Sequence, residues 1–224
     1  MGTHGQGDRV TRRQGERGLI QPVVLVGGKS ARFGRDKLRE PVAAMGSFSG
    51  VREEWLVDRP IAALREVFGA RVALAGECEV EVSRRGDLVI EDRYPGVGPI
   101  GGIVSALEEG TRQGWDGVFV LAGDLPRVGA REVRLVMEAA DRAAAAWAVL
   151  GETDRIEACV GVYRVTALGA LRARIETGNN RLREALPRER LALVRLDAAA
   201  MVNVNRPEDL AVTDTPPHTG SRST

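Results

Sequence analysis

The chain has 224 residues, a formal net charge of +1 and 28% charged residues. This length suits one α/β domain with a sizeable core and is short for two. The balanced charge gives no reason to expect nucleic acid or an acidic membrane as a partner. No apolar run is long enough to span a bilayer and the N-terminus has no apolar core of a signal peptide, so we expect a cytoplasmic protein.

The composition also restricts the chemistry. The only two histidines, His4 and His218, lie in terminal stretches, so the body of the chain has no candidate for a histidine-dependent triad or a histidine-based zinc site. Cys78 and Cys159 are far apart and lack C-x-x-C spacing, which predicts buried free thiols. Chemistry must therefore use carboxylates, amides, Lys, Arg and a hard metal.

Both ends of the chain lack apolar periodicity. We expect a disordered leader over residues 1–18, a single domain over 19–212 and a disordered tail over 213–224.

The first motif is an apolar run that breaks into a Gly-rich loop. Val23 to Val26 predict a strand buried on both faces, and Gly27-Gly28 is a point where the backbone turns sharply or approaches a ligand closely. Three cationic side chains follow: Arg32, Arg35 and Lys37. Backbone N–H donors beside positive charge suit a polyphosphate.

Two other interpretations of this loop are a nucleotide-binding P-loop and a plain surface turn. Gly28-Lys29-Ser30 matches half of the Walker A pattern, but Val23 stands where its first Gly must be, so we reject that pattern. A surface turn with solvated charges is the remaining alternative.

The following elements alternate along the chain. We expect an irregular segment over 38–57, helices over 58–68, 103–109, 130–144, 167–176 and 182–186, strands over 71–75, 88–90, 118–122, 147–150, 158–163 and 191–196, and a helix start at 207–210. Such alternation predicts a doubly wound, mostly parallel sheet in a three-layer α/β/α arrangement.

The second motif follows the 88–90 strand. Gly96 to Gly101 formally satisfy G-x-G-x-x-G, but Asp92 to Pro95 separate them from the strand and Pro99 stiffens the turn, so we reject a dinucleotide site of the NAD type. A Gly-rich crossing with Asp92 as a solvated acid stays open.

The third motif places Asp124 at the carboxyl end of the 118–122 strand. A carboxylate in this position suits Mg²⁺, which takes one or two protein carboxylates together with substrate phosphates and water. An Asp that caps the helix near Gly129 is the alternative.

The fourth motif is Asn203-Val204-Asn205-Arg206-Pro207-Glu208-Asp209-Leu210. The two amides alternate with Val202 and Val204, which predicts one shared face at a strand end. Turn-forming asparagines before a proline are the alternative.

Four motifs follow one another along the chain. They are the spacing G-G-x-S-x-R-x-G-x-D-K from Gly27 to Lys37, the acid followed by G-P-x-x-G, the Asp-x-Pro of Asp124 and the N-x-N segment. In these motifs the chain resembles the molybdenum cofactor guanylyltransferase family, whose members are nucleotidyltransferases with a Rossmann-like fold. It departs from the family pattern at Phe33, at Arg206, in the long 38–57 segment and in lacking an Asn near Glu77.

The resemblance implies transfer of GMP from GTP to the phosphate of molybdopterin, with Mg²⁺ and with other cofactor-assembly proteins as further partners. Implied catalytic residues are Lys37, Arg32 and Asp124, and implied metal ligands are Asp124 and Asn205. Implied nucleotide-binding residues are Leu25, Val26, Gly27, Gly28, Lys37, Asp92, Gly98, Gly101 and Asp124. Asn203 and Asn205 are the implied acceptor contacts.

Two rival functions remain at this stage. One is a related transferase that uses CTP or a sugar-phosphate acceptor. The other is a nucleotide-binding module of the same fold without turnover, which the departures at Phe33 and Arg206 suggest.

Overall fold

The structure is a computed structural model that describes residues 18–27, 36–42, 53–206 and 208–210. The predicted leader up to residue 17, the predicted tail and the loop residues 28–35 lie outside this range. In chain order the elements are β1 (Ile20–Leu25), η1 (Lys37–Arg39), α1 (Asp58–Phe68), β2 (Ala73–Ala75), α2 (Val80–Ser83), β3 (Leu88–Ile90), α3 (Pro99–Gln113), β4 (Gly117–Ala122), α4 (Ala130–Arg142), β5 (Ala148–Glu152), β6 (Ile156–Arg164), η2 (Val165–Ala167), α5 (Leu168–Glu176), η3 (Leu182–Glu184), η4 (Arg188–Arg190) and β7 (Leu191–Arg195).

The strands form one seven-stranded sheet in the order β3-β2-β1-β4-β6-β5-β7. The neighbouring pairs within β3, β2, β1 and β4 are parallel, as is the pair β5 and β7, while β6 runs antiparallel to both β4 and β5. The predicted mostly parallel α/β sheet is confirmed. The antiparallel β6 follows from its short connection to β5, because a hairpin reverses the chain whereas a parallel crossover needs a dozen or more residues.

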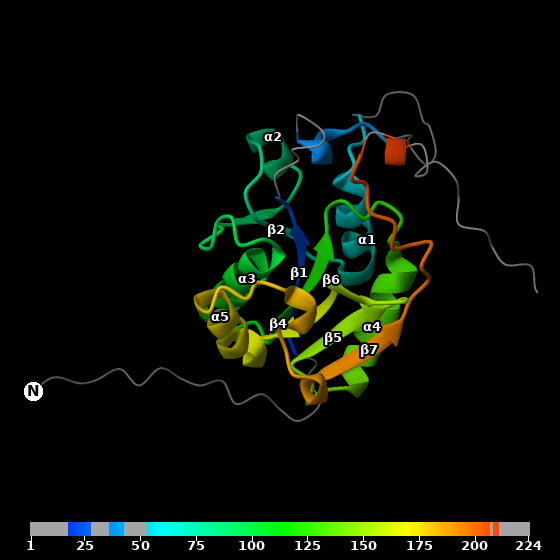
Figure 1. Cartoon of the computed structure of the whole chain (residues 1–224). Helices are drawn as coiled ribbons and strands as arrows, with labels where there is room; N and C mark the ends of the chain where they lie inside the picture. Colours follow the sequence, from blue (N-terminus) through cyan, green and yellow to red (C-terminus); the bar gives the residue numbers. More distant parts are fainter. Residues whose placement is uncertain (1–17, 28–35, 43–52, 207, 211–224) are drawn as a thin grey trace, which may run out of the picture.

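Helices cover both faces of the sheet (Figure 1). α1 and α4 pack on one face, against Val24, Phe119 and Leu121 among others. α3 and α5 pack on the other face, where Val23 and Val120 point. Successive strand residues therefore serve opposite cores, and burial of both faces explains why the strands read as continuous apolar runs.

Several predicted bounds were wrong in detail. α3 begins at Pro99 instead of 103, since proline is well suited to the first turn of a helix, where its missing N–H has no intrahelical partner. β2 is limited to Ala73–Ala75, and the predicted 182–186 helix is only the 3₁₀ turn η3. The short α2 was not predicted. Cys78 and Cys159 are free thiols as predicted, but they are partly rather than fully buried.

The described residues contain no helix that is long and apolar enough to cross a membrane.

Two glycines let the ends of β1 and β2 pack backbone against backbone. Gly76 has a φ of 122°, and a Cβ there would lie 1.6 Å from the carbonyl oxygen of Val26. Gly27 has a φ of 117°, and a Cβ there would lie 2.9 Å from the carbonyl oxygen of Glu77. The predicted close approach at Gly27 is thus, in the described structure, an approach of the neighbouring chain segment.

We expect Gly76→Ala to lower the free energy of unfolding by more than about 3 kcal/mol, because its Cβ collides with the backbone at the end of β1. Gly114→Ala is the matched control: Gly114 also has a positive φ, of 74°, but no atom lies within 4 Å of the added Cβ. It should lose only about 1–2 kcal/mol. Urea unfolding of both variants measures the difference, and equal losses would contradict the steric argument.

Candidate active site

The candidate site lies where the strand order of the sheet reverses. From β1 the chain proceeds to β2 and β3 on one side, and then returns to β4 on the other side of β1. The carboxyl ends of β1 and β4 therefore diverge into connections on opposite sides, which leaves a crevice at this edge of the sheet. Gly27 follows β1 and Asp124 follows β4, so two of the predicted site residues lie at the crevice.

Lys37 is the centre of the site. Its ammonium Nζ lies 2.6 Å from Oδ2 of Asp124, 2.9 Å from the carbonyl oxygen of Val204 and 3.5 Å from Oδ1 of Asn205. The side chains of Lys37 and Asp124 are only 17% and 18% exposed. Three sequence motifs, separated by up to 168 positions, thus converge on one positive charge.

Local structure places Lys37 at this point. Asp36 caps the 3₁₀ turn η1 by accepting a 3.0 Å hydrogen bond from the Leu38 N–H, and the Leu38 side chain is buried in the core. After the turn, the backbones of Glu40 and Val42 pair with those of Leu56 and Glu54. The segment predicted to be irregular therefore includes an antiparallel pairing, with a bridge between Pro41 and Trp55, that anchors the chain just beyond Lys37.

Asp124 is fixed by its own backbone. The Gly123 N–H donates to the carbonyl oxygen of Leu25 at 2.9 Å, and the Val204 N–H donates to the carbonyl oxygen of Asp124 at 3.0 Å. The alternative in which Asp124 caps the next helix is wrong, since the N-cap of α4 is Gly129, whose N–H donates to Oε2 of Glu132. Its carboxylate instead accepts from the ammonium group of Lys37.

The second motif is part loop and part helix. Oδ1 of Asp92 accepts a 2.9 Å hydrogen bond from the Tyr94 N–H, which shapes the loop after β3. Gly98 has a φ of 85° and is the N-cap of α3. Gly101 lies within the first turn of α3, so the residues before the helix predicted over 103–109 already form its N-terminal turn.

The fourth motif is also corrected. The described residues 202–206 form no strand, so Asn203 and Asn205 do not share a strand face. Asn205 lies beside Lys37, whereas Asn203 lines the cavity described below, which does not include Lys37 in its lining. The isolated hydrogen bond from Val204 to Asp124 holds this segment against the end of β4, and it does not extend into a ladder.

Of the remaining predicted residues, Leu25 and Val26 lie at the end of β1, and Gly28 and Arg32 lie outside the described residues.

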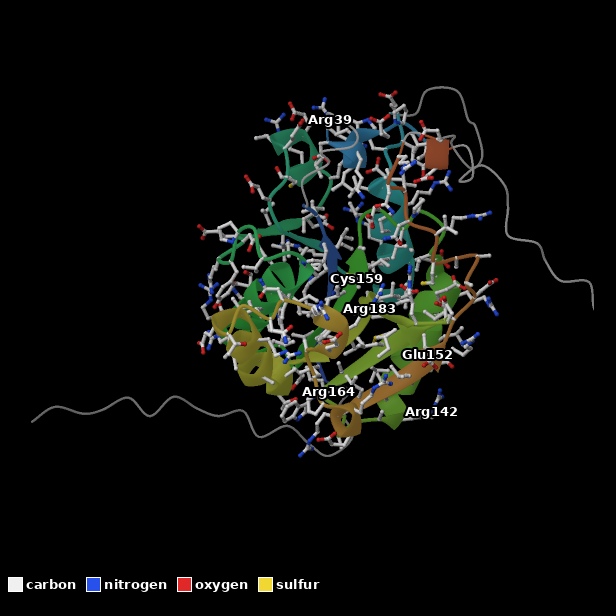
Figure 2. All side chains as sticks on the ribbon, viewed as in Figure 1. Arg39, Arg142, Glu152, Cys159, Arg164 and Arg183 are labelled. Carbon is white, nitrogen blue, oxygen red and sulfur yellow. The ribbon has the colours of Figure 1, made fainter. Side chains whose placement is uncertain are left out.

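A cavity of about 480 Å³ opens next to the Lys37 site. Leu125, which follows Asp124, and Pro99 at the start of α3 form part of its lining. Cys159 of β6 and Arg183 of η3, both labelled in Figure 2, line the cavity. Burial is the main cause that raises the pKa of the Cys159 thiol to about 12, so this group is a neutral thiol and a weak nucleophile at neutral pH.

The cavity contains polar groups that the sequence motifs did not identify. Arg155, Arg181 and Arg183 contribute positive charge to its lining, and Asn180 contributes an amide. Oδ1 of Asn180 is buried and has no hydrogen-bond partner among the described residues. The Gly178-Asn179-Asn180-Arg181 turn between α5 and η3 was a signal for such a site, but it belongs to no motif that we recognised.

The oxygen atoms around Lys37 are of the type that suits a hard cation. The carboxylate of Asp124, the carbonyl of Val204 and the amide of Asn205 already converge on a positive charge. The described residues hold no group of three or more His, Cys, Asp or Glu side chains suited to a metal ion. A divalent ion here would therefore take one protein carboxylate and complete its shell with substrate phosphates and water.

A family model described as the MobA-like NTP transferase domain matches residues 22–193. The chain belongs to the MobA-like NTP transferase family. A probable molybdenum cofactor guanylyltransferase from Opitutus terrae is 30% identical over 193 residues, which cover 83% of this chain and 90% of that protein.

Solved structures agree with this family. The molybdopterin-guanine dinucleotide biosynthesis protein A of Archaeoglobus fulgidus has a TM-score of 0.62 at 25% identity, covering 87% of this chain and 96% of its own. The 2-C-methyl-D-erythritol 4-phosphate cytidylyltransferase of Thermus thermophilus has a TM-score of 0.57 at 18% identity, covering 87% and 96%. The second likeness shows a shared fold. As a member of this family, the protein is a nucleotidyltransferase enzyme associated with molybdenum cofactor biosynthesis.

The Lys37–Asp124 pair can be tested by a double-mutant cycle. We expect Lys37→Met and Asp124→Asn each to cost about 1–3 kcal/mol of unfolding free energy, because each leaves a largely buried charge without its partner. The double variant should cost less than the sum, with a coupling of about 1–2 kcal/mol. The exposed pair Arg134–Glu66 is the control and should couple by less than about 0.5 kcal/mol. Strict additivity at Lys37 and Asp124 would contradict the pairing.

Proposed function

We propose that the protein transfers GMP from GTP to the phosphate of molybdopterin, with Mg²⁺, and releases pyrophosphate. The observation that carries this proposal is the convergence of Lys37, Asp124 and Asn205 at the crevice beyond β1 and β4, in a member of the MobA-like NTP transferase family. We place the reaction in the cytoplasm, beside other cofactor-assembly proteins.

The reaction needs no covalent enzyme intermediate. A phosphate oxygen of the acceptor attacks the α-phosphorus of GTP in line, a new P–O bond forms, and the bond to the bridging oxygen of the β-phosphate breaks. The electron pair of that bond leaves with pyrophosphate. Catalysis then depends on positioning and on neutralising charge at the transferring and leaving phosphates.

The proposed roles follow the charges of the site. Lys37 neutralises the α-phosphate region, while Arg32 and the amides of Gly27 and Gly28 bind the β- and γ-phosphates. Asp124 and Asn205 would hold Mg²⁺, which supplies further neutralisation of the phosphates when bound. Leu25 and Val26 border the nucleotide at the end of β1.

The nucleoside lies, in this proposal, along Asp92, Gly98 and Gly101. A helix N-terminus leaves backbone N–H groups without partners in the helix, which suits the polar edges of a ribose or a base. In the first turn of α3 the Gly101 N–H already donates to the carbonyl oxygen of Gly98 at 3.0 Å, so Gly101 would contribute a close backbone approach and not this donor. The Tyr94 N–H already occupies Oδ1 of Asp92, which leaves Oδ2 as the atom for a ribose hydroxyl or a base N–H.

The acceptor would occupy the adjacent cavity together with Asn203. An apolar part of the lining that includes Leu125, Ala158 and Val160 suits the flat ring of a pterin, and the arginines suit its phosphate. The buried Oδ1 of Asn180, without a partner among the described residues, suits an N–H donor at the edge of such a ring.

The nucleotide choice is tested by the melting temperature with Mg²⁺ and each of GTP, ATP, CTP and UTP. We expect a rise that is selective for GTP, that needs Mg²⁺ and that is lost in Lys37→Met. A CTP-selective rise would favour the related transferase, and a GTP rise without pyrophosphate release in the presence of molybdopterin would favour the binding module.

Asp124→Ala should abolish turnover and leave the circular dichroism spectrum unchanged, because its carboxylate serves the site and lies outside the core. Removing one group that stabilises transition-state charge lowers kcat by about 10²–10³-fold or more. Glu138→Ala on the exposed surface of α4 is the control, with full activity expected. Full activity in Asp124→Ala would reject its assignment to the metal and the phosphates.

The acceptor site is tested with Asn180→Ala. We expect the KM for molybdopterin to rise about tenfold and the KM for GTP to stay within about twofold, since one hydrogen bond to the acceptor is lost. Asn179→Ala is the matched control, because Asn179 precedes Asn180 and does not line the cavity. A larger change in the KM for GTP than in that for molybdopterin would show that the cavity does not bind the acceptor.

A further inference from the structure

Glu108 is a buried carboxylate that the proposed reaction does not use. It lies on α3 and is 7% exposed. Burying a charge costs free energy unless the charge is paired and hydrogen-bonded. Its surroundings therefore indicate what the carboxylate is for.

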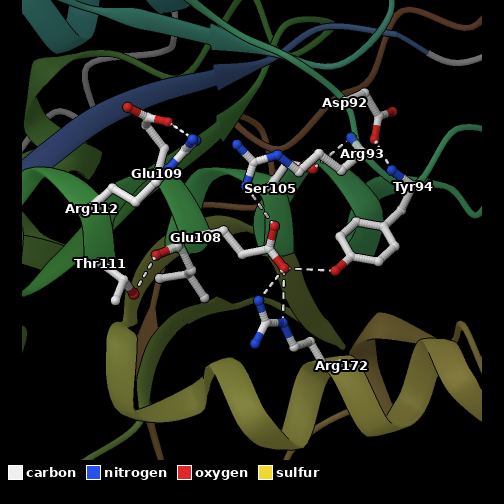
Figure 3. A network of polar contacts seen from close by, with 10 residues as sticks. Asp92, Arg93, Tyr94, Ser105, Glu108, Glu109, Thr111, Arg112 and Arg172 are labelled. Atoms are coloured by element: carbon white, nitrogen blue, oxygen red, sulfur yellow. Dashed lines mark hydrogen bonds and ion pairs between the residues drawn. The ribbon is translucent and has the colours of Figure 1, made fainter.

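Three side chains donate to Glu108 (Figure 3). The Tyr94 hydroxyl donates to Oε1 at 2.6 Å and Arg93 donates to Oε2 at 2.8 Å. Arg172 of α5 donates to Oε1 through both Nε and Nη2, at 2.8 and 2.6 Å. Burial raises the pKa of Glu108, but the hydrogen bonds from Tyr94, Arg93 and Arg172 bring it below its usual value. The carboxylate is therefore ionised at neutral pH.

Arg93 and Tyr94 belong to the loop between β3 and α3. The same loop is held by its backbone, since the Arg93 N–H donates to Oγ of the buried Ser105 at 3.0 Å. It also touches the first turn of α3 so closely that a Cβ on Gly101 would lie 2.7 Å from the carbonyl oxygen of Tyr94. Asp92 directly precedes these residues, so the anchors fix the position of its carboxylate.

Arg172 connects Glu108 to the other side of the site. Two residues along α5, Arg174 donates to the carbonyl oxygen of Glu184 at 2.7 Å, and Glu184 lines the cavity. Glu108 thus lies between the loop at the proposed nucleotide site and the helix that supports the cavity. The contacts of the loop, Arg93 and Tyr94, engage both carboxylate oxygens, whereas those of α5 engage Oε1.

We propose that Glu108 is a positioning residue that holds the loop of Arg93 and Tyr94 in the conformation that receives the nucleotide. It touches no substrate and acts through these two residues on Asp92. This inference rests on the proposed function, because it assigns the purpose of the network to nucleotide binding.

The test compares Glu108→Gln with the wild type. Gln keeps the shape but replaces an accepting oxygen with an NH₂ group that faces donors. We expect the Kd and the KM for GTP with Mg²⁺ to rise about tenfold while kcat, measured with molybdopterin, stays within about twofold. Glu109→Gln is the matched control: Glu109 is the next residue of α3, accepts from Arg112 and Gln113 on the helix surface, and should leave both parameters unchanged.

Two further variants separate positioning from stability. Tyr94→Phe removes one contact on the loop side and should raise the Kd for GTP at least threefold. Arg172→Met removes the contacts on the α5 side, and should lower the melting temperature while the Kd stays within about twofold. If Glu108→Gln does not fold, the Kd of Tyr94→Phe for GTP decides: an unchanged Kd would overturn the positioning role.

Amide hydrogen exchange gives a readout without substrate: Glu108→Gln, but not Glu109→Gln, should exchange the amides of Arg93 and Tyr94 faster. A lower melting temperature with unchanged Kd for GTP and unchanged exchange would overturn the positioning role alone. If the wild type binds no nucleotide, the proposed function and this inference both fail.

Discussion

The ammonium group of Lys37 is the interaction on which the site depends. It joins the turn after the Gly-rich loop, the end of β4 and the segment that follows β7. Each of these segments is also held by hydrogen bonds of its own: the Asp36 carboxylate accepts from the Leu38 N–H, and the N–H groups of Gly123 and Val204 donate to backbone carbonyls. A charge that is largely removed from water needs its partners in place, so the pairing and the backbone contacts stabilise the same arrangement.

The sequence predicted the parts of the fold that depend on period and burial. Val23 and Val24 serve opposite faces of the sheet, and this requirement makes a buried strand recognisable as an apolar run. The position of Asp124 was predicted because an acid just beyond such a run lies at the carboxyl edge of the sheet. The sequence predicted that Lys37 and Asp124 belong to one catalytic site, but the direct contact between their side chains follows only from the structure.

The rest could not be predicted because it depends on contacts between distant segments. The start of α3 was misplaced since Gly101 and Gly102 resemble a loop locally, whereas Gly101 is required there by the carbonyl of Tyr94. The cavity combines Asn203 of the fourth motif with residues of β6 and η3 that form no motif alone. The same reason applies to Glu108. An acid near Val104, Leu107 and other apolar residues of α3 does not indicate, in the sequence, the three side chains that donate hydrogen bonds to it.

Under the proposed function, the sheet topology separates the nucleotide site from the acceptor site. On one side of β4, the parallel strands β1, β2 and β3 end in the Gly27 region and in the loop of Asp92. On the other side, the antiparallel β6 brings Cys159 and its neighbours to the cavity. Asp124 follows the strand between these two halves, so a carboxylate there faces both. In the proposed reaction, the group transferred from one half to the other would pass the position where Lys37 and Asp124 meet.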